Sequence, residues 1–287
     1  MKKYRIEKEY KGYTISEYLR NIQNYSGRSI RNLEIFLNGK RVKPKKKLRA
    51  YEVLLVKEKE KSTNIKPLEI KLNIVYEDEE ILIIDKDPGI VVHPTLKKVD
   101  KTLANGIVYY FKEKYNKIMI PRFYNRLDMD TSGLIIITKT GFAQSFLQEK
   151  CEVKKYYLAI VEGIIEKDEF ILEKPIGRIG NNLKREILPI ENGGQYAKTK
   201  VKVLEKNIEK NITLIEVELF TGRTHQIRVH MSSIGHPLIG DKLYSDKERN
   251  IRQLLHAYRL EFINPISKEK QIIEIEMKED MKKYLYN

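Results

Sequence analysis

NRLDMDTSGLIIIT, residues 125–138, predicts a charged loop that leads into a buried strand. The apolar run at 134–137 is typical of a strand buried on both faces, and the Ser-Gly pair before it is typical of a turn. Arg126, Asp128 and Asp130 precede this strand. Ionisable side chains at the mouth of an apolar strand are partly desolvated, which can shift a pKa or orient a nucleophile. Because Asp-Thr-Ser-Gly is also ordinary turn sequence, the stretch is a candidate site that other segments must support.

The charge of the chain and its distribution indicate a polyanionic partner. The 287 residues are enough for two domains of ordinary size. They include 55 lysine or arginine residues and 40 acidic ones, a net charge of +15. Residues 1–61 alone hold 18 basic and 7 acidic residues. A lysine-rich surface would spread its charge evenly, whereas a basic block at one end favours nucleic acid.

The chain lacks the segments that mark membrane and secreted proteins. It contains no run of about 18 apolar residues, and its start, MKKYRIEKEYKGY, is charged without an apolar core. We therefore expect a cytoplasmic protein with no membrane partner. The single cysteine, Cys151, excludes an internal disulfide and a multi-cysteine zinc site.

Neither a metal nor an organic cofactor is expected. His225 and His230 are five residues apart, a poor fit to one helix face, and no cysteine or carboxylate pattern completes a zinc set. The phosphate-binding patterns GxxxxGK and GxGxxG are absent. Ser132 lacks the GxSxG context of a hydrolase nucleophile.

Residues 1–60 predict a small basic domain that mixes helix and strand. Thr14 and Glu17 form a capping box at the start of a helix over 13–24, and a second basic turn follows at 27–31. Asn38-Gly39 predicts a hairpin turn between a strand around 35–37 and another within 48–56. This order resembles the small RNA-binding module named after a small-subunit ribosomal protein. Residues 61–69 then read as a linker.

Residues 70–287 predict a second, larger domain. Thr102 and Thr140 are candidate caps of two helices, the second ending near Lys150. Most of the expected strands are joined by short turns instead of crossover helices. The expected fold class is therefore α+β, with a mixed, largely antiparallel central sheet and peripheral helices. The expected strands are 70–76, 81–86, 90–92, 134–137, 156–161, 199–203, 212–220, 256–263 and 271–277.

A second charged cluster occurs in TGRTHQIRVHMSSIGHP, residues 221–237. If Thr224 caps a helix here, Arg228 lies on the flank of its apolar face and can reach sideways into a cleft. A surface arginine is the commoner case for any single Arg. Arg223 and His225 accompany Arg228 near a helix N-terminus, however, and such an end attracts anions.

Five segments in this order resemble the motifs of the RluA family of RNA pseudouridine synthases. The resemblance covers most of the region from about 70 to 277, and it implies the pseudouridine synthase fold. It also implies an enzyme that isomerises uridine in RNA without a cofactor. The segments are DKDPGIVVHP at 85–94, NRLDMDTSGLIII at 125–137, KKYYLAIVEG at 154–163, TGRTHQIRVHM at 221–231 and LLHAYRLEF at 254–262.

The resemblance also implies roles for individual residues. Asp128 matches the family's nucleophile, and Arg228 matches the arginine that pairs with it. Tyr157 matches the tyrosine that packs on the target base and is a candidate base for proton transfer; Tyr156 is the competing match. Arg126 matches the arginine that displaces or holds the target nucleotide. The other polar residues of these motifs are expected to bind substrate: Lys155, Arg223 and His225.

The chemistry of the reaction agrees with these roles. Uracil must leave the ribose, turn and rejoin through carbon 5, which requires an ionised carboxylate in a fixed orientation. A bidentate arginine can keep a carboxylate ionised and fix its orientation. The flipped base must be held by aromatic stacking and arginine contacts. One departure is Asn125, where the family usually has histidine; a hydrogen-bond donor remains but a titratable group is lost.

Three alternatives stay open beside the expected substrate, large-subunit ribosomal RNA. Transfer RNA is another substrate class, because the sequence does not reveal which RNA shape is recognised. A non-catalytic RNA-binding or ribosome-assembly protein could keep the fold, although pure binding does not need an aspartate in an RNA cleft. An N-glycosidase with a carboxylate pair fits less well, since Asp128 and Asp130 are only two residues apart. We expect a monomer.

Overall fold

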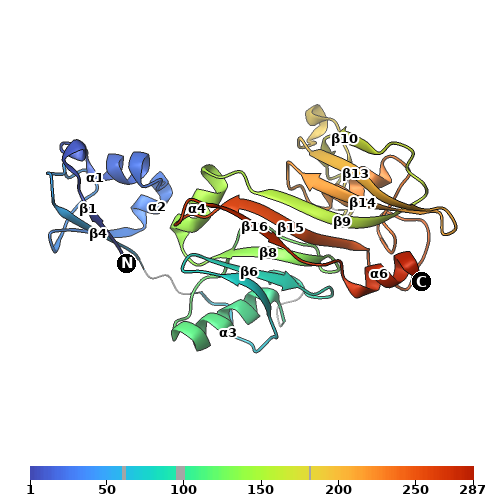
Figure 1. The fold of residues 1–287 in the computed structure, drawn as a ribbon, viewed down its shortest axis with the longest axis horizontal. Coiled ribbons are helices and arrows are strands. Elements are labelled where there is room, and N and C mark those ends of the chain that lie inside the picture. The colour runs from blue at the N-terminus through green and yellow to red at the C-terminus, as the bar shows by residue number, and fades with distance from the viewer. Residues whose placement is uncertain (60–62, 95–100, 181) are drawn as a thin grey trace.

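The computed structural model describes residues 1–59, 63–94, 101–180 and 182–287. Residues 1–59, here called the module, form one four-stranded sheet, and residues 63–287, here called the main body, form a larger one. The module lies at one end of the molecule, beside a helix of the main body (Figure 1). Residues 61 and 62 of the predicted linker lie outside the described residues, and 63–72 contain no helix or strand.

The module is built around a sheet with strand order β1-β4-β2-β3. The predicted capping box is present, because Thr14 Oγ1 accepts from the Glu17 backbone and the Glu17 carboxylate accepts from the Thr14 backbone. The predicted Asn38-Gly39 turn is also present, with positive φ at both residues. Its elements are β1 (Lys2–Arg5), α1 (Ile15–Glu17), a π-helical turn η2 (Tyr18–Ile22), α2 (Gly27–Arg31), β2 (Leu33–Leu37), β3 (Lys40–Arg41) and β4 (Val53–Glu58).

The sheet of the main body confirms the predicted fold class. Its strand order is β10-β13-β14-β9-β15-β8-β6-β5, with β16 beside β15 and β7 beside β8. Every described pair is antiparallel except β15 and β8, which run parallel. The strands are β5 (Asn73–Glu77), β6 (Ile81–Lys86), β7 (Arg122–Phe123), β8 (Ser132–Thr138), β9 (Lys154–Glu162), β10 (Glu169–Glu173), β13 (Lys198–Asn207), β14 (Ile212–Leu219), β15 (Leu255–Ile263) and β16 (Lys270–Glu274).

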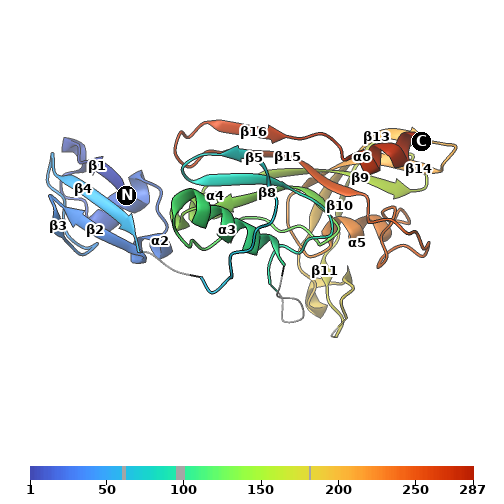
Figure 2. The ribbon, with the colours of Figure 1, turned by 90° about the horizontal axis from the view of Figure 1, so that it is seen from below.

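Four helices lie at the periphery of this sheet (Figures 1 and 2). Thr102 and Thr140 cap the first two, as predicted. Two expectations are wrong. Residues 90–92 are no strand, since Val91 makes only a single bridge to Thr102, and the cap of the third helix is His225, not Thr224. The helices are α3 (Leu103–Tyr115), α4 (Gly141–Glu149), α5 (Gln226–Ser232) and α6 (Glu279–Tyr286).

Strand β8 is apolar along its whole length because both of its faces are covered. Ile135 and Ile137 pack in the cluster that includes α3, whereas Leu134 and Ile136 pack in the cluster that includes α4. Gly133 has a φ of +115°, and a Cβ there would lie 2.2 Å from the Ala257 carbonyl oxygen. Only glycine therefore permits the close parallel contact between β8 and β15.

A small two-stranded sheet pairs β11 (Ile176–Gly177) with β12 (Glu186–Ile187). Residue 181 lies outside the described residues. Among the described residues, no helix is a candidate for crossing a membrane.

Candidate active site

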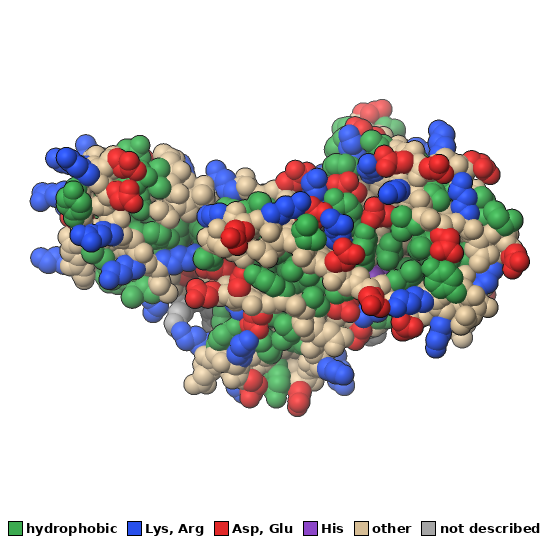
Figure 3. Space-filling model, in the orientation of Figure 1, with side chains coloured by type: hydrophobic (Ala, Val, Ile, Leu, Met, Phe, Trp, Pro, Cys, Tyr) green, Lys and Arg blue, Asp and Glu red, His purple; other side chains and the backbone are tan. Residues whose placement is uncertain are grey.

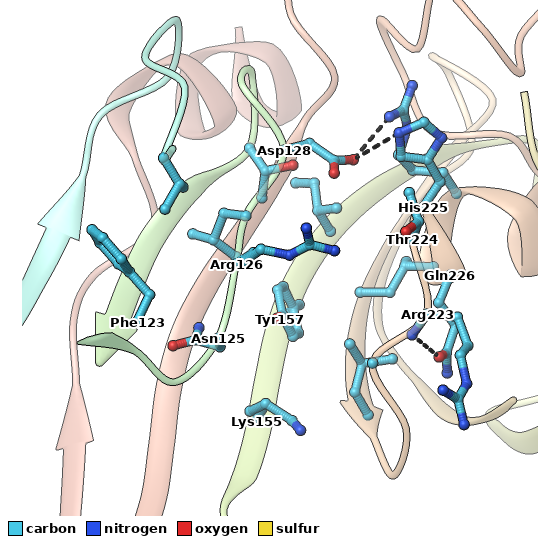
Figure 4. A pocket seen from close by; sticks show the side chains of 18 of the residues that line it. Phe123, Asn125, Arg126, Asp128, Lys155, Tyr157, Arg223, Thr224, His225 and Gln226 are labelled. Carbon is cyan, nitrogen blue, oxygen red and sulfur yellow. Dashed lines mark hydrogen bonds and ion pairs between the residues drawn. The ribbon is translucent and has the colours of Figure 1, made fainter. Parts of the chain in front are cut away.

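A cavity of about 1110 Å³ opens where the loop before β8, strand β9 and the start of α5 meet. Side chains from these three segments face one another across it (Figure 4). The structure brings all seven predicted site residues to this one cavity: Arg126, Asp128, Lys155, Tyr157, Arg223, His225 and Arg228.

Asp128 and Arg228 form the central ion pair of the cavity. A terminal guanidinium nitrogen of Arg228 lies 2.9 Å from Asp128 Oδ2. The side chain of Asp128 is 31% exposed, whereas that of Arg228 is 8% exposed. The carboxylate is therefore oriented by a buried partner while it stays open to a ligand, as a nucleophile requires.

Asp241 fixes Arg228 from the other side. Its carboxylate accepts hydrogen bonds from Arg228 Nε at 2.7 Å and from the second terminal nitrogen at 2.8 Å. Asp241 also accepts from the backbone N–H groups of Leu243 and Tyr244. Burial alone would lower the pKa of Arg228, but the contacts with Asp241 and Asp128 outweigh it and raise the pKa.

The loop that carries Asp128 is anchored at both ends. On one side, Asn125 Nδ2 donates to the Leu134 carbonyl at 3.1 Å, and Asn125 Oδ1 accepts from the Ile136 N–H at 2.9 Å. Both the nitrogen and the oxygen of the Asn125 amide are thus hydrogen-bonded to the backbone of β8. In the structure Asn125 therefore has a backbone hydrogen-bonding role.

On the other side, the residue after Asp128 is held by the 86–90 segment. The Met129 carbonyl accepts from Lys86 Nζ at 2.8 Å and from the Gly89 N–H at 2.9 Å. Lys86 also donates to the carbonyls of Asp87 and Ile90, and it is 1% exposed. Burial lowers its pKa to about 8. Lys86 is therefore a buried clamp on the Asp128 loop.

Tyr157, and not Tyr156, lies at the base of the cavity. Tyr157 is 5% exposed. Tyr156 lies on the other face of β9, where the Arg259 guanidinium is 5.3 Å from its ring. Burial and the negative charge of Asp128 raise the pKa of Tyr157. Its hydroxyl is therefore protonated at neutral pH when Asp128 is ionised.

His225 contacts the same ion pair from the start of α5. Its Nε2 lies 3.8 Å from Asp128 Oδ2, and its Nδ1 lies 3.0 Å from the Tyr244 hydroxyl. Burial and the neighbouring Arg228 lower the pKa of His225, although Asp128 acts in the opposite direction. His225 is therefore neutral at neutral pH. Its left-handed backbone conformation, φ 58°, directs it toward the cavity.

The three other predicted residues supply positive charge around the cavity. Arg126 is exposed, and Arg223 is exposed with its Nε donating to the Tyr196 carbonyl at 2.9 Å. Burial lowers the pKa of Lys155, which lies on β9. Positively charged side chains around a cavity favour the binding of a ligand with phosphate groups.

Sequence reasoning missed three residues of this site: Lys86 as a clamp, Asp241 and Tyr244. The only local signal for the last two was a Gly-Asp pair at 240–241, at which Gly240 has a φ of +75°. Ser132, which the sequence argued against as a nucleophile, is 0% exposed and lies 3.0 Å from His256 Nδ1. It therefore faces the core and not the cavity.

Comparison with known proteins gives the family. Residues 80–233 match the model of the RNA pseudouridylate synthase family, which is more than half of the chain. The chain belongs to this family. The matched segment includes Asp128, Tyr157 and Arg228. The protein is thus an RNA pseudouridine synthase of the RluA type, an isomerase that acts on RNA.

Individual relatives agree with this assignment. An RNA pseudouridine synthase of Aquifex aeolicus is 34% identical over 91% of this chain and 87% of its own length. The ribosomal large subunit pseudouridine synthase D of Zymomonas mobilis is 38% identical over 75% of this chain and 72% of its own. The structure of human RNA pseudouridylate synthase domain containing 1 has a TM-score of 0.58 and 26% identity, and covers 72% of this chain and 83% of its own.

Proposed function

We propose that this synthase isomerises uridines of large-subunit ribosomal RNA, with Asp128 as the nucleophile. The environment of Asp128 supports its assignment as the nucleophile. Its carboxylate lies 2.9 Å from Arg228 and is partly exposed to the cavity. The names of relatives such as the Zymomonas mobilis enzyme support the ribosomal substrate. Transfer RNA is the second candidate, because the residues that line the cavity do not reveal the shape of the RNA around the target uridine.

The reaction exchanges one glycosidic bond for another. The bond between ribose carbon 1′ and uracil N1 breaks, and a bond between carbon 1′ and uracil C5 forms. The proton on C5 leaves, and N1 gains a proton, so the product has the atoms of the substrate. The Asp128 carboxylate attacks the nucleoside and is later released, which requires the target uridine to be flipped out of its stack into the cavity.

Two roles of Tyr157 fit different stages of this reaction. Its ring lies at the base of the cavity and can pack against the flipped uracil. While Asp128 is anionic, the pKa of Tyr157 is raised by that charge as well as by burial. Once Asp128 is bonded to the nucleoside its charge is gone, and one cause of the raised pKa is removed. The hydroxyl can then give up its own proton more readily, and the phenolate so formed can take the proton from C5.

The substrate-binding roles follow from charge and exposure. We assign Arg126, Lys155 and Arg223 to the phosphates on either side of the flipped uridine, and His225 to the ribose or base beside Asp128. We also propose that residues 1–60 form a separate RNA-binding domain joined by the linker 61–69 to a catalytic domain at 70–287, and that the enzyme works as a cytoplasmic monomer. The hydrophobic cluster of the module, to which Phe142 of the main body is, among the described residues, the single buried contributor from outside residues 1–59, supports this division.

The nucleophile is tested by tritium release from RNA labelled at uridine C5. Asp128→Asn should bind unmodified large-subunit ribosomal RNA with wild-type affinity and release tritium at least about a thousandfold more slowly. Asp130→Asn is the matched control, because it removes an aspartate two residues away that does not line the cavity. Wild-type release by Asp128→Asn would refute the nucleophile, and faster release from transfer RNA transcripts than from ribosomal RNA would refute the substrate.

A further inference from the structure

Arg185 lines the active-site cavity from a segment outside the five that resemble the family motifs. It directly precedes strand β12 and is half-buried. After burial and Arg228, the positive charge of Arg185 is a further cause of the lowered pKa of His225. Arg185 therefore faces the same space as His225 and Asp128.

A small hydrophobic cluster holds β11 and β12 against helix α5. Ile176 of β11, Val229 of α5 and Tyr244 are all buried in this cluster. Strand β12 pairs with β11 and also lies against α5. The position of Arg185 is therefore set by packing on α5, the helix that supplies the arginine of the central ion pair.

The Tyr244 hydroxyl fixes the backbone at Arg185. It accepts from the Arg185 N–H at 2.7 Å and lies 3.0 Å from His225 Nδ1. Burial raises the pKa of Tyr244, so the hydroxyl keeps its proton at neutral pH. Because the Arg185 N–H can only donate, that proton is directed to His225 Nδ1, which accepts it. Tyr244 thus ties Arg185 to a residue that contacts Asp128.

The guanidinium of Arg185 is available to a ligand. Within residues 1–59, 63–94, 101–180 and 182–287, no group is hydrogen-bonded or ion-paired to it. Arg228 and Arg252, by contrast, each bind a carboxylate through two nitrogens. On the face of the main body drawn in Figure 3, basic side chains are interspersed with acidic ones (Figure 3). Arg185 therefore differs from these arginines and from that face in offering an unpaired cation beside the cavity.

A phosphate matches this guanidinium better than the other groups of a flipped uridine do. A guanidinium presents N–H groups in a fixed plane that fit two phosphate oxygens at once. Uracil must turn between the breaking of one glycosidic bond and the formation of the other, whereas the phosphates stay in the RNA backbone. A charged contact with a phosphate holds the nucleotide without opposing this turn.

We propose that Arg185 is a further substrate-binding residue, whose guanidinium binds a phosphate next to the target uridine on the side of the cavity where His225 lies. Tyr244 is the residue that positions it. The inference rests on the proposed function, because it needs the target uridine beside Asp128.

The test is the salt dependence of RNA binding by Arg185→Gln. One lost phosphate contact in single-stranded RNA should make the slope of log affinity against log salt shallower by about 0.7. The dissociation constant for unmodified large-subunit ribosomal RNA and the KM for tritium release should both rise about tenfold, with kcat within about threefold of wild type, because the contact is made equally in ground state and transition state. Arg185→Lys keeps the charge and should restore the slope to within about 0.3 of wild type.

The matched control is Lys202→Gln, which removes the same charge. Lys202 is exposed on β13 and does not line the cavity. Its slope and KM should equal those of wild type. Arg185→Gln with the slope and dissociation constant of this control would overturn the proposal. A lower kcat at an unchanged slope would overturn it too, because the contact would then be with the reacting uracil instead of a phosphate.

Tyr244→Phe tests the positioning of Arg185. His225 is neutral at neutral pH, so its displacement does not alter the salt slope, and a change in slope reports on Arg185. Tyr244→Phe should make the slope shallower by at least about 0.3, and should add no further change in a chain that already carries Arg185→Gln. An unchanged slope in Tyr244→Phe would refute the positioning role of the hydroxyl.

Failure of the proposed function gives different results. Wild-type tritium release by Asp128→Asn would refute the nucleophile, but the binding comparison between Arg185→Gln and Lys202→Gln would still decide the phosphate contact. Faster release from transfer RNA transcripts than from ribosomal RNA would refute the substrate, and the same slopes measured on those transcripts would then decide the role of Arg185.

Discussion

Arg228 lies between two carboxylates, with Asp128 at 2.9 Å from one terminal nitrogen and Asp241 at 2.7 Å from Nε. The two acids differ in what surrounds them. The side chain of Asp241 is fully buried, whereas that of Asp128 is 31% exposed. Asp241 therefore anchors the arginine, and the arginine orients Asp128, the carboxylate that we propose as the nucleophile. Because Asp241 is not among the residues that line the cavity, it is a positioning residue whose effect on catalysis passes through Arg228.

We predict that Asp241→Asn lowers kcat about 10- to 100-fold and changes KM less than twofold. The amide keeps the size of the side chain but loses one acceptor and its charge, so Arg228 is free to tilt, and a small misplacement of a catalytic group costs a factor of this order. Asp246→Asn is the control, because Asp246 is exposed on the same segment. A loss that merely tracks the folded fraction measured by circular dichroism would contradict a positioning role.

Asn125 yields a prediction about the anchoring of the Asp128 loop. Asn125→Asp keeps the acceptor for the Ile136 N–H but places a carboxylate oxygen against the Leu134 carbonyl. We expect the free energy of unfolding to fall by about 1 to 3 kcal/mol, the usual cost of leaving a buried polar group unsatisfied. Urea titration at pH 7.5 measures this change, with exposed Asn250→Asp as the control. Equal unfolding midpoints for the two variants would show that the amide is not an anchor.

Tyr157→Phe separates the two roles proposed for the tyrosine. The ring remains at the base of the cavity, so the dissociation constant for RNA should stay within about twofold of wild type. Loss of the hydroxyl should slow tritium release by about 10² to 10⁴, the usual contribution of general acid or base catalysis. Tyr156→Phe, on the opposite face of β9, should release tritium at the wild-type rate. Full activity of Tyr157→Phe would remove the hydroxyl from the proton transfer and leave only the packing role.

The sequence predicted those elements of the fold whose caps and turns are determined by residues close to them in the chain. The caps Thr102 and Thr140 and the Asn38-Gly39 turn depend on neighbouring residues only. The strand expected at 90–92 failed for the opposite reason. An apolar triplet becomes a strand only with a partner, and Val91 finds only a single bridge to Thr102.

A site residue could be predicted where it lies in a segment with a recognisable sequence pattern, such as a charged cluster on an expected helix. The cluster at 221–237 placed Arg228 on a helix flank, and the structure has it buried against Asp128. Asp241 could not be found in this way, because it lies in a segment without helix or strand and acts through a contact made only in the folded chain. His225 depends on a left-handed backbone conformation that no neighbouring residue demands.

The buried His256 predicts how stability depends on pH. Its Nε2 lies 3.0 Å from the Glu276 carbonyl, which can only accept, so Nε2 carries the proton and Nδ1 accepts from the Ser132 hydroxyl. Burial lowers its pKa from 6.5 to about 4. Between these two values the unfolded chain binds more protons than the folded one, and stability therefore falls as the pH falls through this window. From pH 7 to pH 5 this one group should cost roughly 2 kcal/mol of unfolding free energy.

His256→Gln checks that contribution, because the amide can hydrogen-bond but does not titrate. The variant should be less stable than wild type at pH 7, since its amide fits the two partners less well. Between pH 7 and pH 5, however, its free energy of unfolding should fall by roughly 2 kcal/mol less than that of wild type. Urea unfolding followed by circular dichroism at both pH values gives the four numbers needed. If the free energy of unfolding fell equally in both proteins, His256 would not contribute to the acid sensitivity of the fold. The contacts with Ser132 and Glu276 would then not favour the neutral form of His256.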